Sequence, residues 1–129
     1  MSKILIDTNI YSGALRGAPD VVAILRKAER IAISSISIGE LFSGFKGGSR
    51  EQKNRDELAE FLDAPRVDVY PVDEGTSEFY AAILNQLRQQ GRPISTNDIW
   101  IAAVAQQHGL ALYSNDAHFQ QIPGLLLLV

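Results

Sequence analysis

The sequence predicts an α/β fold in which about five parallel strands form one sheet with helices on both faces. Short apolar runs recur along the chain and are separated by segments with apolar residues at helical spacing, an alternation typical of parallel sheets. These runs are continuous rather than alternating, as in strands that are covered on both sides. The chain has 129 residues, 46% of them hydrophobic and 21% charged. We therefore expect a single domain over residues 1–129 with its own core.

The first half of the chain begins with a continuous apolar run that predicts a strand at Lys3–Ile6. A helix at Ile10–Leu15 should follow, with Asn9 as its N-cap. Pro19 is suited to the first turn of a second helix that extends to about Arg30. The next expected elements are a strand at Ile31–Ser34, a helix at Ser37–Phe45 ended by two glycines, and a polar amphipathic helix at Ser49–Leu62.

The second half of the chain continues the alternation. A third strand is expected at Val67–Val72, and Pro71 favours a place at the edge of the sheet because proline has no N–H to donate. The following elements are a helix at Glu74–Gln90, a loop at Gly91–Pro93 and a helix at Asn97–His108, with Gly109 as its stop. A strand at Leu110–Tyr113, a turn or short helix at Asn115–Phe119 and a buried last strand at Leu125–Leu128, within an apolar run that reaches Val129, complete the chain.

Composition narrows the classes of function. A net charge of -3 excludes a strongly basic nucleic-acid-binding domain but leaves room for a local basic patch. Without cysteine, the chain forms no disulfide, thiolate nucleophile or cysteine zinc site. The first seven residues contain too short an apolar run for a signal peptide, and the longest apolar run is far below the ~20 residues of a membrane helix. We therefore expect a cytoplasmic protein that does not bind membranes.

Four acidic residues fall at matching places in this map. Asp7 follows the first strand and Asp116 follows the fourth. Glu40 is expected on the first turn of the helix after the second strand, and Asp98 on the first turn of the helix before the fourth. In a parallel sheet, the carboxyl ends of the strands and the helices that follow them share one edge, where ligands bind. We expect the four carboxylates to converge there, provided that the helix with Asp98 starts at that edge.

Each acid also has a purely structural interpretation. Asp7 fits a helix cap, Ser37 and Glu40 fit a capping box, Asp98 suits the positive end of a helix dipole, and Asp116 suits a turn. Together, however, four carboxylates repel one another and raise each other's pKa, which a fold tolerates when a cation lies among them. Oxygen ligands, no cysteine and only two histidines favour Mg²⁺ or Mn²⁺ over zinc. Such ions serve phosphate chemistry by activating water, so a phosphodiester or phosphoanhydride is the expected substrate.

Three stretches carry a resemblance to a known family: ILIDTNIYSG, SSISIGELFSG and PISTNDIWIAAVAQQHGLALYSNDAHFQQIPGL. Together they resemble the PIN-domain ribonucleases, above all the VapC-type toxins of prokaryotic toxin–antitoxin pairs. They extend over nearly the whole chain, and the pattern NDxxIAA followed by SNDxxF is more specific than DTN alone. The resemblance implies a PIN-like fold and an endoribonuclease that depends on Mg²⁺, for which Mn²⁺ substitutes.

The resemblance also assigns roles to particular residues. Asp7, Glu40, Asp98 and Asp116 match the metal-binding acids of the family, the fourth of which is the most variable. Thr8, Asn9 and Ser114 match small polar residues that orient carboxylates or water around the metal. The family further implies an RNA substrate, a homodimer, and a VapB-like antitoxin that wraps the toxin and places a basic side chain in the acidic site.

Basic residues provide candidates for RNA contacts. Arg92 stands in the loop before Asp98, and Lys46 and Arg50 belong to the basic stretch FKGGSREQKNR. The same stretch also fits a solvated helix face. If these side chains contact phosphates, RNA binding should depend on salt. His118, two residues after Asp116, fits either a surface position or a hydrogen bond near the site.

Other classes of protein also place acids at strand ends. A phospho-accepting receiver domain needs a lysine after its last strands, and this chain has none after Lys53. A haloacid-dehalogenase-type phosphatase needs an acid two residues after the first, where Asn9 stands. The alternatives that we retain are a metal-dependent protein-binding module, although its D-x-S-x-S pattern is absent at Asp7, and a non-toxin phosphoesterase on the same scaffold. RNA cleavage in Mg²⁺ or Mn²⁺ separates these functions.

Overall fold

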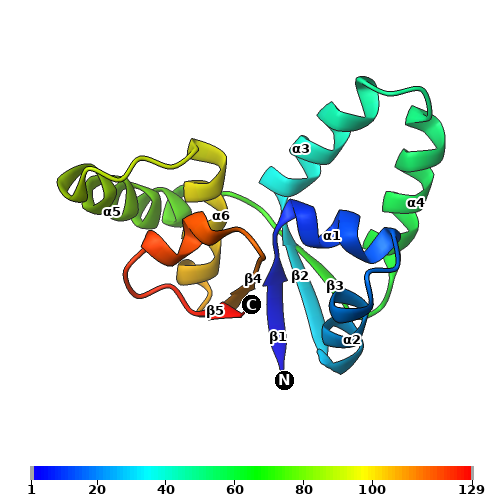
Figure 1. Cartoon of the computed structure of the whole chain (residues 1–129), viewed down its shortest axis with the longest axis horizontal. Helices are drawn as coiled ribbons and strands as arrows, with labels where there is room; N and C mark the ends of the chain where they lie inside the picture. The colour runs from blue at the N-terminus through cyan, green and yellow to red at the C-terminus, as the bar shows by residue number, and fades with distance from the viewer. Residues whose placement is uncertain (1, 129) are drawn as a thin grey trace.

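The computed structural model describes residues 2–128 and contains a five-stranded sheet, all of whose strands run parallel (Figure 1). The strand order is β3-β2-β1-β4-β5, so the first strand of the chain lies at the centre. The predicted α/β class and five-stranded parallel sheet are confirmed. The strands are β1 (Lys3–Ile6), β2 (Arg30–Ser34), β3 (Val67–Tyr70), β4 (Ala111–Tyr113) and β5 (Leu127–Leu128).

Helices cover both faces of the sheet, as predicted. In Figure 1, the first four helices lie to one side of the strands, and the later helices lie to the other. The helices on the first side are α1 (Thr8–Leu15), α2 (Pro19–Lys27), α3 (Ser35–Lys46) and α4 (Glu51–Asp63), and those on the second are α5 (Glu74–Gln90), α6 (Thr96–Gln107) and the 3₁₀ helix η1 (Ala117–Gln121). Within residues 2–128, none of the helices is long and apolar enough to cross a membrane.

Two hydrophobic cores lie on the two faces, because successive side chains of a strand point to opposite sides. Ile4 and Ile6 of β1 pack with residues of α1 to α4, whereas Leu5 between them packs with residues of α5 and α6. Helix α6 is the most deeply buried helix, with the whole segment Ile101–Ala105 inaccessible to solvent or nearly so. Its three alanines allow the helix to lie close to the sheet, which fixes the position of its first turn.

The N-caps of two helices are notable. The N-cap of α1 is not Asn9 but Asp7, as the structural interpretation of this acid had it, since Asp7 Oδ1 accepts a hydrogen bond from the Ile10 amide at 2.9 Å. The N-cap of α3 is Ser34, the last residue of β2, whose hydroxyl accepts from the Ser37 amide at 3.2 Å. The predicted Ser37–Glu40 capping box is therefore wrong: strand β2 passes directly into α3, Ser37 is buried inside the helix, and Glu40 lies on the second turn.

The two edge strands agree with the prediction only in part. β3 forms one edge, as the proline at its end predicted, although it stops at Tyr70. β5 forms the other edge and has only two residues, both partly buried, and the preceding Leu126 is 59% exposed. The prediction of a buried last strand is wrong, because an edge strand has a neighbour on one side only. Val129, the end of that apolar run, lies outside the described residues.

Candidate active site

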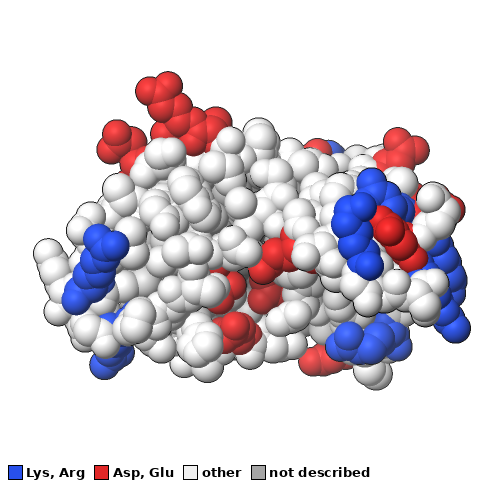
Figure 2. Space-filling view, turned by 90° about the horizontal axis from the view of Figure 1, so that it is seen from above, with Lys and Arg blue, Asp and Glu red and all other residues white. Residues whose placement is uncertain are grey.

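The four predicted acids lie at the carboxyl edge of the sheet, which is the upper edge in Figure 1. Asp7 ends β1 and caps α1, and Asp116 follows β4 and caps η1. Asp98 joins them because α6 begins at this edge, with Ser95 as its N-cap. Glu40 reaches the edge from α3. Figure 2 looks onto this face and shows acidic side chains gathered in a hollow at its centre, with basic side chains toward the two ends.

Asp7 is the most buried of the acids, with 5% of its surface exposed. One carboxylate oxygen accepts from the Ile10 amide, and the other accepts from the hydroxyl of Ser114. Burial raises the pKa of Asp7, and the charges of Asp98 and Asp116 raise it further, whereas the two hydrogen bonds oppose the rise. Asp7 is thus held in one orientation by neutral donors that leave its charge unpaired.

Asp98, Asp116 and His118 come closest together. Each offers a ligand atom, and these atoms all lie within 4.8 Å of one another. Burial raises the pKa of Asp98, as do the charges of Asp116 and Glu40. His118 Nδ1 lies 3.2 Å from Asp116 Oδ1, and the His118 amide donates to the same oxygen at 2.9 Å. Both interpretations of His118 therefore hold: its side chain is 61% exposed, and it lies beside Asp116.

Ser114 joins the ends of the two central strands. It is completely buried, its hydroxyl donates to Asp7, and the same oxygen accepts from the Asp116 amide at 2.9 Å. A single small hydroxyl residue therefore fixes the acid after β1 relative to the acid after β4. This contact is consistent with the small polar residue that the sequence placed before the fourth acid.

Glu40 is held between α1 and α6. The Thr8 hydroxyl donates to Oε1 at 2.5 Å, and the Asn97 side chain donates to Oε2 at 3.3 Å. Asn97 was absent from the predicted site, although its place directly before Asp98 was a usable signal. Asn9, which was predicted, is exposed, and within residues 2–128 its side chain makes no hydrogen bond to the acids. A groove of about 660 Å³ runs beside Glu40 and is lined by small residues of α3, among them Gly39 and Ser43.

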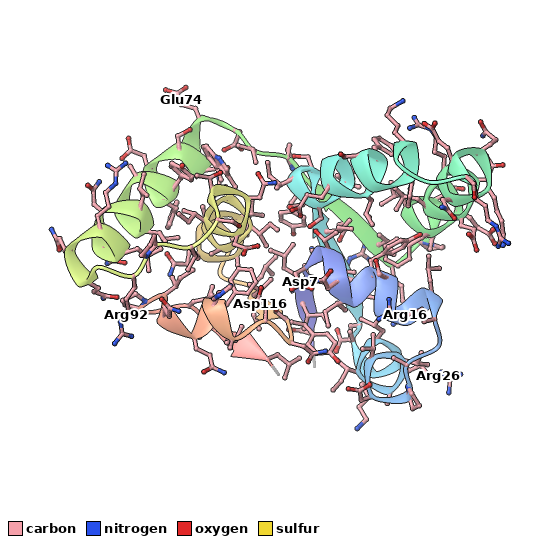
Figure 3. All side chains as sticks on the ribbon, turned by 45° about the horizontal axis from the view of Figure 1, so that its top comes forward. Asp7, Arg16, Arg26, Glu74, Arg92 and Asp116 are labelled. Atoms are coloured by element: carbon pink, nitrogen blue, oxygen red, sulfur yellow. The ribbon has the colours of Figure 1, made fainter. Side chains whose placement is uncertain are left out.

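The predicted RNA-contacting residues lie farther out. Lys46 and Arg50 flank the turn between α3 and α4, and Lys46 pairs with Glu51 at 3.2 Å. Arg92 follows α5, and Figure 3 shows it at the outer end of that helix, away from Asp7 and Asp116. The structure therefore brings none of the three basic residues into the acidic hollow.

The donor set fits a divalent cation. Carboxylate oxygens are the ligands that Mg²⁺ and Mn²⁺ prefer, and Mn²⁺ also accepts an imidazole nitrogen such as that of His118. Each close neighbour of Asp7 that raises its pKa by charge is another acid, so a cation here relieves repulsion that the fold itself leaves in place.

Comparisons with known proteins agree with this fold and site. The family model described as "PIN domain" matches residues 4–125. Ribonuclease VapC2 of Rickettsia felis is 31% identical over 95% of this chain and 94% of that protein. Ribonuclease VapC4 of Mycobacterium tuberculosis is 30% identical over 94% and 92%. The solved structure of VapBC2 from Rickettsia felis, bound to a DNA fragment from its promoter, superposes with a TM-score of 0.86 at 29% identity, covering 99% of this chain and 98% of that one. The chain therefore belongs to the PIN domain family, as a member of VapC type.

Proposed function

We propose that the protein is an endoribonuclease that hydrolyses RNA phosphodiesters with the help of bound Mg²⁺, for which Mn²⁺ substitutes. The observation that carries this proposal is the approach of Asp98, Asp116 and His118 to within 4.8 Å of one another, beside the buried carboxylate of Asp7. The similar proteins of Rickettsia felis and Mycobacterium tuberculosis, which are named ribonucleases, support the same substrate class.

The residues proposed to hold the cation are Asp7, Glu40, Asp98 and Asp116. A bound cation would lower the pKa of a water molecule that it coordinates and would neutralise charge on the phosphate. The protein's part is to hold the carboxylates in place before the substrate arrives. Ser114 and the Ile10 amide do this for Asp7, and Thr8 and Asn97 do it for Glu40, so little reorganisation is needed on binding.

Cleavage of RNA by the purified protein tests the proposal directly. Total RNA should be degraded in Mn²⁺ or Mg²⁺, EDTA should stop the reaction, and excess Mn²⁺ should restore it. Asp7→Asn and Asp98→Asn should each lower cleavage by at least ~100-fold while the circular dichroism spectrum stays that of a folded protein. Glu60→Gln, on the exposed face of α4, is the matched control and should cleave normally. Full activity in both aspartate variants would overturn the metal assignment.

A wild-type protein that binds Mn²⁺ but leaves RNA intact would favour one of the retained alternatives. Hydrolysis of bis(p-nitrophenyl) phosphate would then indicate a non-toxin phosphoesterase, and no hydrolysis would indicate a metal-dependent protein-binding module. The two assays use the same protein sample and buffer, so they distinguish the three functions without any additional variant.

We also propose that the protein is the toxin of a toxin–antitoxin pair, acts in the cytoplasm as a homodimer, and is inhibited by a VapB-like antitoxin. The similar structure from Rickettsia felis, which is of VapBC2, supports the pairing with an antitoxin. A basic side chain of the antitoxin, placed in the acidic hollow, would relieve the repulsion among Asp7, Asp98 and Asp116. Expression without the antitoxin should arrest growth, and expression of Asp7→Asn should not. Equal tolerance of both forms would contradict a toxin function.

A further inference from the structure

A second hollow lies where the end of α5 meets the start of α6. It has a volume of about 390 Å³ and is formed by the end of α5, the loop after it and the start of α6. Leu84, Leu87, Ile94 and Ile99 form its apolar wall, and Arg88 and Arg92 lie at its rim. We call it the Arg88–Arg92 pocket. Its volume is in the range of small-molecule binding sites, which begins at about 300 Å³.

The charges of this pocket are unbalanced. Within residues 2–128, no carboxylate lines the pocket, and neither Arg88 nor Arg92 forms an ion pair. Arg30 and Lys46, in contrast, each pair with an acid, Asp68 and Glu51 respectively. Two guanidinium groups above an apolar wall favour a ligand that combines an anionic group with an apolar one.

Local backbone geometry holds the two arginines at one rim. Gly91 ends α5 with φ of 65°, a left-handed conformation that glycine adopts without strain. The amide of Arg92 then donates to the Leu87 carbonyl at 3.0 Å, which folds the chain back over the last turn of α5. The pocket is therefore built into the helix end.

The pocket is connected to the acidic site through two elements. Ile99 of its wall is next to Asp98 on α6, so the two sites share the start of that helix. Arg92 also lines a polar hollow with Gln120 and Gln121 of η1, the helix that Asp116 caps. A chain of nucleotides that follows η1 outward from Asp116 thus reaches Arg92.

We propose that the Arg88–Arg92 pocket binds one nucleotide of the RNA substrate, with its base against the apolar wall and its phosphate between the two guanidinium groups. This inference rests on the proposed ribonuclease function. Guanidinium groups bind phosphate in bidentate fashion, and an unstacked base packs against apolar side chains such as the leucines and isoleucines of this wall. The pocket also supplies positive charge outside the acidic hollow, whose carboxylates repel RNA until a cation binds among them.

RNA binding tests the arginines separately from cleavage. The protein carries Asp7→Asn to prevent cleavage, and a fluorescein-labelled, mixed-sequence RNA of twelve nucleotides is titrated at several salt concentrations by anisotropy. Adding Arg88→Ala and Arg92→Ala should weaken binding by about 10- to 100-fold and reduce the slope of log Kd against log salt by about 0.7 for each phosphate that the protein no longer neutralises. The matched control is Arg26→Ala, an exposed arginine on α2 at the other end of the molecule in Figure 3. It should change binding less than about twofold.

Isoleucine methyl spectra test the base-binding wall. In the Asp7→Asn protein, the same RNA should shift the methyl signals of Ile94 and Ile99 but not that of Ile24 on α2. An acidic peptide, hexaglutamate, is the competing probe. If hexaglutamate shifts Ile94 and Ile99 and RNA does not, the pocket binds acidic peptides and the proposal is wrong.

The two proposals fail in different ways. A wild-type protein that cleaves no RNA refutes the ribonuclease function. A wild-type protein that cleaves RNA, while the double arginine variant binds RNA with the same affinity and salt dependence as Arg26→Ala, refutes only the pocket. Equal melting temperatures of the arginine variants and the parent exclude misfolding as the cause of weaker binding.

Discussion

Replacing Asp98 with asparagine should stabilise the protein in the absence of metal. Burial raises the pKa of Asp98, and the charges of Asp116 and Glu40 raise it further, so the ionised carboxylate is costly in the folded state. Asparagine has nearly the same shape and keeps an acceptor oxygen but carries no charge. Because Asp98 is also a proposed cation ligand, the same substitution should weaken metal binding, and stability and metal affinity should change in opposite directions.

The magnitude follows from the distance between the carboxylates. The ligand atoms of Asp98 and Asp116 lie within 4.8 Å of each other. Two unit charges at that distance repel by about 0.9 kcal/mol in water and about 3.5 kcal/mol at an effective dielectric constant of about 20. Both side chains are partly exposed, which favours the lower part of this range. We expect a gain of about 1 to 2 kcal/mol, or about 3–8 °C in melting temperature for a chain of this length.

Thermal and urea unfolding in EDTA at neutral pH measure this gain, with Glu60→Gln as the control that should change stability by less than about 0.5 kcal/mol. Adding Mn²⁺ at about 100 times its Kd should stabilise the wild type by about 2.7 kcal/mol and Asp98→Asn by much less. Asp98→Asn should therefore be more stable than the wild type in EDTA and less stable than the wild type in Mn²⁺. If Asp98→Asn instead lowers the melting temperature in EDTA while Glu60→Gln does not, the reasoning from carboxylate repulsion is refuted.

Three further predictions concern pH, Ser114 and Tyr11. Below the ordinary carboxyl pKa of 3.8, Asp7 and Asp98 are protonated in both the folded and the unfolded chain. As pH rises toward their raised folded pKa, the unfolded chain releases protons first and stability falls. The advantage of Asp98→Asn in urea unfolding should thus be absent at low pH and grow above about pH 4, and a pH-independent advantage would contradict it. Ser114→Ala removes the hydroxyl that donates to the Asp7 carboxylate and accepts from the Asp116 amide, and it should cost about 1–3 kcal/mol of stability and about 10- to 100-fold in cleavage, measured by urea midpoint and RNA degradation. The Tyr11 hydroxyl is buried and has no hydrogen-bond partner among residues 2–128, so Tyr11→Phe should be neutral or stabilising by up to about 1 kcal/mol, and a lower melting temperature would show that the hydroxyl has a partner in solution.

The positions of strands and long helices followed from local patterns, but the start of α3 did not. Ser34, Ser35 and Ser37 are all suitable N-cap residues, and Ser37 with Glu40 even completes a capping-box pattern. The structure uses Ser34, because β2 enters α3 without a loop and the end of the strand fixes where the helix begins. That choice depends on the sheet, so sequence spacing placed Glu40 one turn too early.

The position of the four acids at one edge of the sheet was predictable, because strand ends mark the carboxyl edge of a parallel sheet. The side chains that hold them were less so. Thr8 and Ser114 adjoin or nearly adjoin an acid in sequence and do contact one, but Asn97 acts on Glu40, 57 residues away. Asn9, only two residues from Asp7, points elsewhere because successive residues of a helix face different directions. Contacts between elements depend on how α6 and α3 approach each other, which no local pattern contains.

The surroundings of Asp68 show why the unpaired acids at the other edge of the sheet are informative. Asp68 lies near the amino ends of the strands, where Arg30 and Lys3 hold its pKa well below the usual range. The fold thus has the means to neutralise a carboxylate with its own cations. The carboxyl edge is different. Within residues 2–128, no lysine or arginine pairs with Asp7 or Asp98, and neutral donors fix the orientation of Asp7 instead. Held in place but not neutralised, these charges favour a cation that comes from outside the chain.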